Sequence, residues 1–228
     1  MALLALVDVD GTLLLSDDLV AGEAFGSALR DCYPVEPPPD AVARTDHPGQ
    51  TAQRIARLVL RNEGLADARV DEHLKAWCAR FAERYVELLT EADTSRWQAA
   101  PGAAEALTRL QEGGVRLALL TGNPEAMARA RMERLGLAAF FPQGQGAFGC
   151  DAEDRVELLA IARERAGDWP AGRTVEIGDT PRDVESAHAA GVRAIHVRSP
   201  RSRDEFSGAD AVCDSLGAVA DLLLAWNR

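Results

Sequence analysis

Residues 3–12 read LLALVDVDGT and join a short apolar run to a polar loop. Five apolar residues in a row, with no alternation of polar ones, are typical of a strand that is buried on both faces of a parallel sheet. The run stops at Asp8, and Asp10 and Gly11 follow in a sequence that favours a turn. We therefore predict a buried first strand that ends in an acidic loop.

The same apolar pattern recurs along the chain, and stretches with helical spacing lie between the runs. Further strands are expected at residues 115–120, 174–177, 193–197 and, more weakly, 209–213. The stretches with helical spacing are 103–111, 125–135, 153–166, 182–190 and 216–226. Strands that alternate with helices of this length indicate an α/β fold. Its core is a Rossmann-like, doubly wound parallel sheet covered on both faces.

Residues 16–94 interrupt this alternation. They contain no convincing strand, but 51–61 and 70–89 carry apolar residues at helical spacing. The segment predicts an all-helical cap inserted after the first strand, which we call the helical insert. Residues 1–15 and 95–228 would form the catalytic core, and the two short junctions between the parts would act as a hinge.

Length, composition and charge define the class of protein. The chain has 228 residues, of which 47% are hydrophobic and 27% charged, so it can bury a core and does not have the composition of a disordered protein. Lys+Arg 25 against Asp+Glu 36 gives a net charge of -11, which repels polyanions. We expect no nucleic-acid partner, and an anionic substrate must meet a local positive site.

Two further features indicate the compartment. Residues 1–7 have no basic region and run directly into Asp8, so they predict neither a signal peptide nor a membrane span. We expect a cytoplasmic protein with no membrane partner, either a monomer or a homodimer. The cysteines are scattered without a C-x-x-C pair, which favours free thiols over disulfides or zinc ligands. They are Cys32, Cys78, Cys150 and Cys213.

Polar side chains stand where the predicted strands end, and ligands of doubly wound sheets bind outside these carboxyl ends. Carboxylates that meet there need a cation, because like charges a few ångströms apart raise each other's pKa. A hard divalent metal with oxygen ligands satisfies this need, and Mg²⁺ fits best. The strand-end residues are Asp8 and Asp10, then Thr121, Gly122 and Asn123, then Asp179 with Asp183 close by.

The segments that contain these strand-end residues resemble signature segments of the haloacid dehalogenase superfamily of phosphatases. The first segment is DVDGT at 8–12, the second is LLTGN at 119–123, and the fourth is IGDTPRD at 177–183. A single acid of this kind is equally typical of a helix cap or a turn, but the ordered combination is specific. The resemblance spans residue 3 to about residue 198. The helical insert resembles the cap of phosphoglycolate-phosphatase-like members.

The resemblance implies hydrolysis of a phosphate ester in two steps. Asp8 would attack phosphorus and form an aspartyl phosphate. Asp10 would protonate the leaving alkoxide and then deprotonate the hydrolytic water, while its backbone carbonyl binds the metal. Asp179 would complete the metal site beside Asp8, and Asp183 would support it from behind.

The second segment would hold the phosphate group. Thr121 and the backbone N–H groups near Gly122 and Asn123 stand at the start of a predicted helix, and a helix N-terminus is a favourable place for an anion. The resemblance therefore implies that these three residues bind phosphate oxygens.

The third segment departs from the family pattern, because the usual lysine is missing. The only lysine, Lys75, lies in the helical insert. Arg155 is the expected replacement, since DAEDR at 151–155 precedes or opens a helix at the usual interval before the fourth segment. Arg163 and Arg165 would lie deeper in that helix. A surface arginine paired with a nearby acid is the alternative.

Substrate specificity should come from the helical insert, since catalytic loops on a sheet serve many chemistries. Arg44, Thr45 and His47 belong to the polar stretch RTDHPGQ, which resembles the cap loop of phosphoglycolate-phosphatase-like proteins. Arg44 or His47 could bind a substrate carboxylate or hydroxyl. The alternative is that Thr45 or Asp46 only caps the following helix.

The expected function is a Mg²⁺-dependent phosphatase for a small phosphorylated metabolite of the phosphoglycolate or sugar-phosphate type. A phosphotransferase or sugar-phosphate mutase of the same superfamily is the first alternative, although mutase relatives usually carry a histidine where residues 20–25 have none. A regulatory binding protein without activity is the second. A phosphonatase and a dehalogenase are not expected. A phosphonatase would need a lysine in the first cap helix, which has none, and a dehalogenase would normally lack the second acid that Asp10 supplies here.

Overall fold

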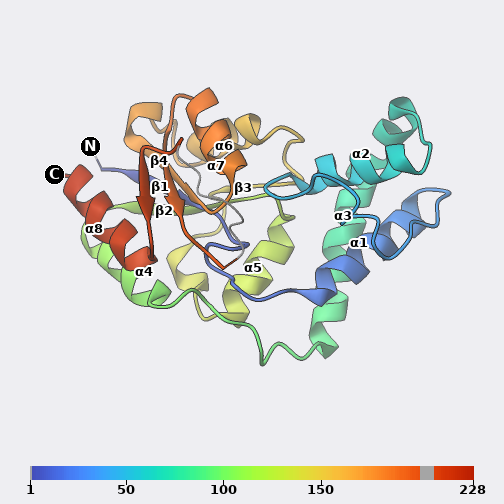
Figure 1. Cartoon of the computed structure of the whole chain (residues 1–228), viewed down its shortest axis with the longest axis horizontal. Helices are drawn as coiled ribbons and strands as arrows, with labels where there is room; N and C mark the ends of the chain where they lie inside the picture. Colours follow the sequence, from blue (N-terminus) through green and yellow to red (C-terminus); the bar gives the residue numbers. More distant parts are fainter. Residues whose placement is uncertain (1, 201–207) are drawn as a thin grey trace.

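A computed structural model of the chain describes residues 2–200 and 208–228 (Figure 1). Met1 and residues 201–207, which the sequence prediction assigns to the core, lie outside the described residues. The described strands form one six-stranded sheet in the order β3-β2-β1-β4-β5-β6, and every pair is parallel. They are β1 (Leu4–Val7), β2 (Arg116–Thr121), β3 (Ala147–Phe148), β4 (Thr174–Gly178), β5 (Arg193–Val197) and β6 (Ala211–Cys213).

The strand order confirms the predicted doubly wound α/β fold. The chain adds β2 and β3 on one side of β1 and then crosses to add β4, β5 and β6 on the other, so the order reverses beside β1. β3 was not predicted, because a strand of two residues is too short to show an apolar pattern. The crevice outside the carboxyl ends of β1 and β4 is where such sheets bind ligands.

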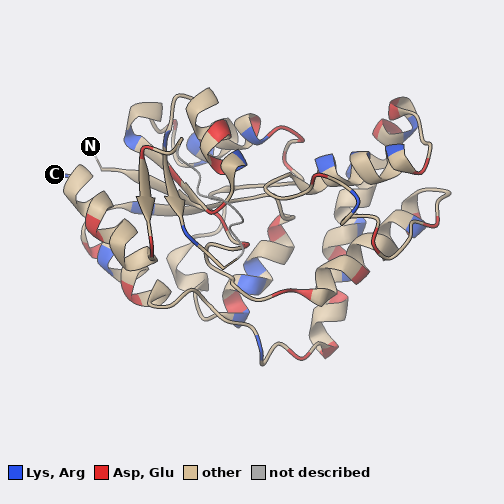
Figure 2. Ribbon diagram, in the orientation of Figure 1, with Lys and Arg blue, Asp and Glu red and all other residues tan. Residues whose placement is uncertain are grey.

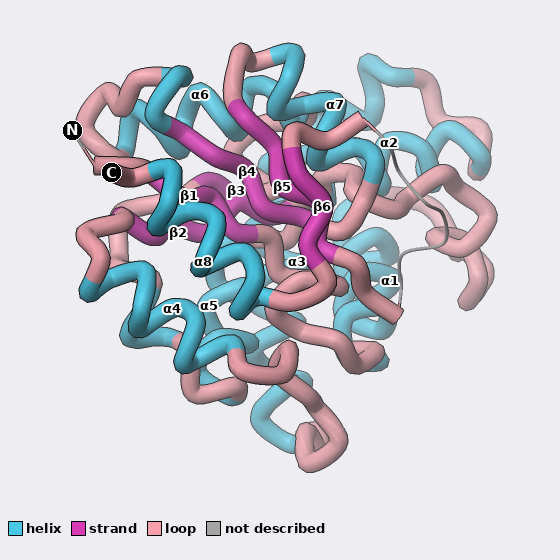
Figure 3. Tube along the Cα trace, turned by 60° about the vertical axis from the view of Figure 1, so that its left-hand side comes forward, coloured by secondary structure: helices cyan, strands magenta, loops and turns pink. Residues whose placement is uncertain are grey.

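Helices cover both faces of the sheet (Figure 3). Alternate residues of β1 explain why its whole run is apolar, because Ala5 and Val7 pack on one face while Leu4 and Leu6 pack on the other. The first face is covered by α4 (Ala103–Glu112), α5 (Glu125–Arg134) and α8 (Leu216–Trp226). The second face is covered by α6 (Arg155–Arg165) and α7 (Pro181–Ala189).

The helical insert forms a separate cluster beside the sheet (Figure 1). Its helices are α1 (Leu19–Cys32), α2 (Ala52–Asn62) and α3 (Asp67–Glu91). α2 and α3 occupy the two predicted helical stretches, while α1 lies in a part for which we predicted no helix range. Aromatic rings of Phe25, Trp77 and Phe81 pack together at its centre.

The two connections between the insert and the sheet run side by side. The backbone N–H of Leu15 donates to the carbonyl of Gln98 at 3.0 Å, and the Ser16 hydroxyl donates to the Arg96 carbonyl at 3.0 Å. These contacts support our proposed division into 1–15 plus 95–228 and 16–94, since both crossings occur at one place.

A disulfide joins Cys78 on α3 to Cys150, which follows β3, with their Cα atoms 5.9 Å apart. The prediction of free thiols is therefore wrong for this pair, while Cys32 and Cys213 are free. The 72-residue separation between the two cysteines does not indicate a pair in the sequence. Their proximity arises only when α3 packs against the sheet domain. The bond ties the helical insert to the core.

Breaking this cross-link should destabilise the protein. The bond closes a loop of 72 residues, and a loop of this length restricts the unfolded chain by an amount worth up to about 4 kcal/mol. We expect Cys150→Ser to lower the free energy of unfolding by about 2–4 kcal/mol in urea. Cys32→Ser serves as the control. Identical unfolding curves with and without dithiothreitol would contradict the disulfide.

Charged residues lie mainly on the helices and loops, where acidic and basic positions are interspersed (Figure 2). On α3, for example, Arg80 pairs with Glu83 and Arg84 pairs with Glu87. Among residues 2–200 and 208–228, no helix combines the length and apolar character that a membrane crossing requires.

Candidate active site

The carboxylates of Asp8, Asp179 and Asp183 meet at the carboxyl ends of β1 and β4. One oxygen from each lies within 4.8 Å of the others, and all three residues are buried. The parallel register pairs Val7 with Ile177, so that Asp8 and Asp179 leave neighbouring strands at the same edge. We call these three residues the acidic cluster. The structure thus brings together three of the four predicted metal ligands.

The loop after β1 approaches the acidic cluster closely because of Gly11. Its φ of 82° lies in the left-handed region that favours glycine, and a Cβ at this position would collide with the Asp179 carboxylate. The Ser199 hydroxyl donates to Oδ2 of this carboxylate at 2.7 Å. The buried Thr12 hydroxyl beside Gly11 has no hydrogen-bond partner among the described residues.

Asp183 is held by the start of α7. Thr180 caps this helix, and the Asp183 carboxylate accepts hydrogen bonds from the Thr180 N–H at 2.8 Å and from its hydroxyl at 2.7 Å. The sequence Thr-Pro-x-Asp produces this arrangement, because proline suits the first helical position and the acid completes a capping box. Asp183 is therefore fixed before any ligand binds.

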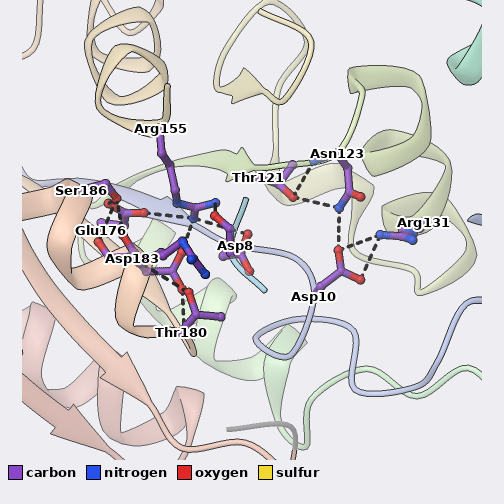
Figure 4. A network of polar contacts seen from close by, with 12 residues as sticks. Asp8, Asp10, Thr121, Asn123, Arg131, Arg155, Glu176, Thr180, Asp183 and Ser186 are labelled. Carbon is purple, nitrogen blue, oxygen red and sulfur yellow. Dashed lines mark hydrogen bonds and ion pairs between the residues drawn. The ribbon is translucent and has the colours of Figure 1, made fainter. Parts of the chain in front are cut away.

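Arg155 reaches into the acidic cluster from the first turn of α6 (Figure 4). Its side chain is 8% exposed, and Nη2 hydrogen-bonds Asp183 and lies 3.7 Å from Asp8 Oδ1. Burial lowers its pKa, but the surrounding carboxylates outweigh this effect and raise the pKa above its ordinary value. The guanidinium thus stays charged beside Asp8.

The two alternative arginines lie elsewhere. Arg163 donates to the Trp169 carbonyl at 2.7 Å, and Arg165 pairs with Asp151 at 2.7 Å. Neither of these contacts involves the acidic cluster, so the position of Arg155 favours it as the replacement for the usual lysine.

Glu176 is a site residue that the sequence reasoning missed. It lies on β4 with 1% exposure, and its Oε1 accepts from Arg155 Nη2 at 3.1 Å. Burial raises the pKa of Glu176 to about 8 despite the opposing effect of Arg155. The signal was a lone acid between Val175 and Ile177 in the strand sequence TVEIG, which predicts a buried charge that needs a partner.

The acidic cluster carries more negative charge than its arginine neutralises. Burial and, to a smaller extent, repulsion from Asp183 raise the pKa of Asp8 well above its usual value, while Arg155 opposes the rise. A divalent cation would relieve this repulsion, and three converging carboxylate oxygens are ligands that Mg²⁺ accepts. The residues present therefore fit a Mg²⁺ site.

Asp10 turns its carboxylate away from the acidic cluster (Figure 4). Its Oδ2 accepts from Asn123 Nδ2 at 2.6 Å and from Arg131 Nη1 at 2.9 Å. The Asp10 side chain is 41% exposed, so incoming molecules can reach it. Metal binding through its backbone carbonyl stays a prediction. Arg131 was not predicted; its only sequence signal is a charge on the face of α5 that also buries Met127 and Ala128.

Thr121 and Asn123 stand at the end of β2, next to β1. Thr121 is 1% exposed, and its hydroxyl accepts from the Asn123 side chain at 2.9 Å and from its backbone N–H at 3.3 Å. Asn123 therefore bridges Thr121 and Asp10 across two neighbouring strand ends (Figure 4).

A loop of the helical insert covers these strand ends. The Gly49 carbonyl accepts from Arg155 Nη1 at 3.4 Å, and the N–H of Ala52 donates to the Gly122 carbonyl at 2.7 Å. A Cβ on Gly122 would collide with the Gln50 carbonyl, so glycine permits this close approach. The insert is closed over the acidic cluster.

The predicted specificity residues have contacts inside the insert. Arg44 pairs with Asp40 at 2.9 Å, the Thr45 hydroxyl donates to the Val42 carbonyl at 2.7 Å, and His47 Nδ1 lies 3.2 Å from the Thr45 carbonyl. Asp46 reaches the core instead, where it pairs with Arg182. Substrate binding by Arg44, Thr45 and His47 stays a prediction.

Comparisons with known proteins agree with this geometry. A family model described as haloacid dehalogenase-like hydrolase matches residues 3–191. Among curated proteins, the phosphoglycolate phosphatase of Mesorhizobium japonicum is 31% identical over 120 residues, which are 52% of each chain. The phosphoglycolate phosphatase of Rhodospirillum rubrum is 33% identical over 165 residues, which are 70% of this chain and 66% of that protein. The chain thus spans about half to two thirds of these two relatives.

The solved structures show the same fold. The crystal structure of CbbY from Rhodobacter sphaeroides in complex with phosphate has a TM-score of 0.67, covers 96% of both chains and is 22% identical. At this identity the likeness is one of fold alone. Together with the match to most of the sequence, it leads to one assignment: the chain belongs to the haloacid dehalogenase-like hydrolase family.

Proposed function

We propose that the protein is a Mg²⁺-dependent phosphatase that hydrolyses a small phosphorylated metabolite through an aspartyl phosphate. The observation that carries this proposal is that the buried carboxylates of Asp8, Asp179 and Asp183 lie close together beside the cationic side chain of Arg155. Relatives named phosphoglycolate phosphatase, and a CbbY structure in complex with xylulose-(1,5)bisphosphate, support a small phosphorylated substrate.

The carboxylates of Asp8 and Asp179 and the backbone carbonyl of Asp10 would hold the metal, with Asp183 as support. When bound, Mg²⁺ would offset the repulsion between the phosphate and these acids and polarise the phosphoryl group. Arg155, fixed by Glu176 and Asp183, would neutralise phosphate oxygens on the other side.

The reaction would proceed in two displacements at phosphorus. An Asp8 oxygen forms a bond to phosphorus as the ester P–O bond breaks, and Asp10 gives its proton to the departing alkoxide. Asp10 then takes a proton from a water molecule, which attacks phosphorus and releases Asp8 and inorganic phosphate. The exposed position of the Asp10 carboxylate suits contact with both the leaving group and water.

Thr121, Gly122 and Asn123 would bind the transferring phosphate. The Thr121 hydroxyl lies at the end of β2, and Asn123 lies between it and Asp10. The closed loop at 46–50 favours a small substrate, because its backbone already contacts Arg155 and Gly122. Phosphoglycolate and sugar phosphates are therefore the first substrates to test.

Release of inorganic phosphate from a panel of phosphorylated metabolites tests the proposal. We expect release from at least one small phosphate ester in Mg²⁺, loss of this activity in EDTA, and recovery when Mg²⁺ is restored. Release without an acceptor sugar separates hydrolysis from phosphate transfer. No release from any ester in the panel, or equal rates with and without the chelator, would count against the proposed function.

A further inference from the structure

Arg131 is a buried arginine whose guanidinium lies at the centre of a polar network. It belongs to α5, and its side chain is 2% exposed. Nη1 donates to both carboxylate oxygens of Asp10, at 2.9 and 3.1 Å. Nη2 donates to Asp18 at 2.8 Å, and Nε lies 3.3 Å from the Tyr85 hydroxyl. The cation therefore has a polar partner on each side.

These partners belong to different parts of the fold. Asp10 lies in the loop after β1, whereas Asp18 caps α1 and Tyr85 lies on α3. The Tyr85 hydroxyl donates to Asp18 at 2.7 Å, and its ring lies under the guanidinium at 5.6 Å. Arg131 thus joins the loop that carries the proposed general acid to two elements of the helical insert.

The charges in this network favour an arginine at position 131. Burial lowers the pKa of Arg131, but Asp10 and Asp18 outweigh burial and keep the pKa above its ordinary value. The planar guanidinium can donate to both carboxylates along different edges, whereas a lysine ammonium is a single compact charge on a flexible stem. Without the cation, Asp10 and a buried Asp18 would face each other with no neutralising charge between them.

We propose that Arg131 is a positioning residue for Asp10. It holds the Asp10 carboxylate away from the acidic cluster and on the side where a leaving group departs. Because the same guanidinium contacts Asp18 and Tyr85, Asp10 is fully held only when the helical insert lies against the sheet. This inference rests on the proposed function and assigns Arg131 a part in its proton-transfer step.

Leaving-group dependence distinguishes positioning from a purely structural role. An alkyl phosphate needs its leaving oxygen protonated, whereas p-nitrophenyl phosphate releases p-nitrophenolate, a stable anion that needs little help. We expect Arg131→Met to lower kcat/KM, which reports the step in which the leaving group departs, at least about tenfold more for glycerol 2-phosphate than for p-nitrophenyl phosphate. Arg131→Lys should recover part of the loss, and Tyr85→Phe should show the same selectivity to a smaller degree.

Arg129→Met is the matched control, since Arg129 lies on the same helix but contacts Glu125 and loop carbonyls. It should affect both substrates equally. The role of Arg131 would be overturned if Arg131→Met and Tyr85→Phe lose activity equally on both substrates while Asp10→Asn loses more activity on glycerol 2-phosphate. If Asp10→Asn also loses activity equally on both substrates, the acid role of Asp10 in the proposed function is overturned instead. If Arg131→Met does not fold, the lysine and Tyr85 variants decide the matter by the same comparison.

Discussion

Asp8→Asn should abolish phosphate ester hydrolysis, with a loss in kcat on the order of 10⁵-fold. Asparagine has nearly the same shape as aspartate, but its amide does not attack phosphorus. The substitution also removes a negative charge from a buried site where burial and neighbouring acids raise the pKa of Asp8. We therefore expect the metal-free variant to be at least as stable as the wild type.

Two measurements on the same preparation check this expectation. Phosphate release in Mg²⁺ should vanish, while the thermal unfolding midpoint in EDTA should stay equal or rise. Glu63→Gln, an exposed acid just after α2, is the control and should change neither quantity. Turnover comparable to the wild type would refute the assignment of Asp8 as the nucleophile.

Arg155→Met should lower both kcat and the free energy of unfolding. The side chain is buried against Asp8, Glu176 and Asp183, and loss of one partner from a buried ion pair costs about 3–5 kcal/mol. We expect a decrease of this size in the free energy of unfolding and a loss of about 10²-fold or more in kcat, because a phosphate oxygen loses its cation. Arg155→Lys keeps the charge and should retain part of both.

A second substitution separates the two effects. Arg155→Met combined with Glu176→Gln removes one buried negative charge together with the positive one, so part of the stability should return while activity stays lost. Urea unfolding and phosphate release measure the two properties independently. If the double variant is no more stable than Arg155→Met, the stability loss does not arise from the charge imbalance.

The sequence predicted the features that depend on local pattern. Apolar runs located β1, β2, β4 and β5, because strands buried on both faces have no polar positions. β3 was not predicted. It has only two residues, which pair with Leu120 and Thr121 of β2, and two residues leave no periodic signal in the sequence. The acids at the ends of β1 and β4 could be expected to meet because parallel strands end at one edge of the sheet.

Features that depend on packing between distant segments could not be predicted in this way. The Cys78–Cys150 disulfide requires α3 to lie against the segment after β3. Arg131 and Glu176 are charges within buried faces, and such charges indicate that a partner exists without saying which residue it is. The structure supplies Asp10 and Asp18 for Arg131, and Arg155 for Glu176.

Peptide mapping by mass spectrometry after an acid quench tests the covalent mechanism most directly. Protein mixed with Mg²⁺ and a reactive phosphate ester should carry a phosphoryl group on the peptide that contains Asp8. Asp10→Asn should increase this labelled fraction, because water attack on the intermediate loses its base. The label should be absent in EDTA and in Asp8→Asn. Steady turnover with no label on Asp8, or with the phosphoryl group on another residue, would contradict the account.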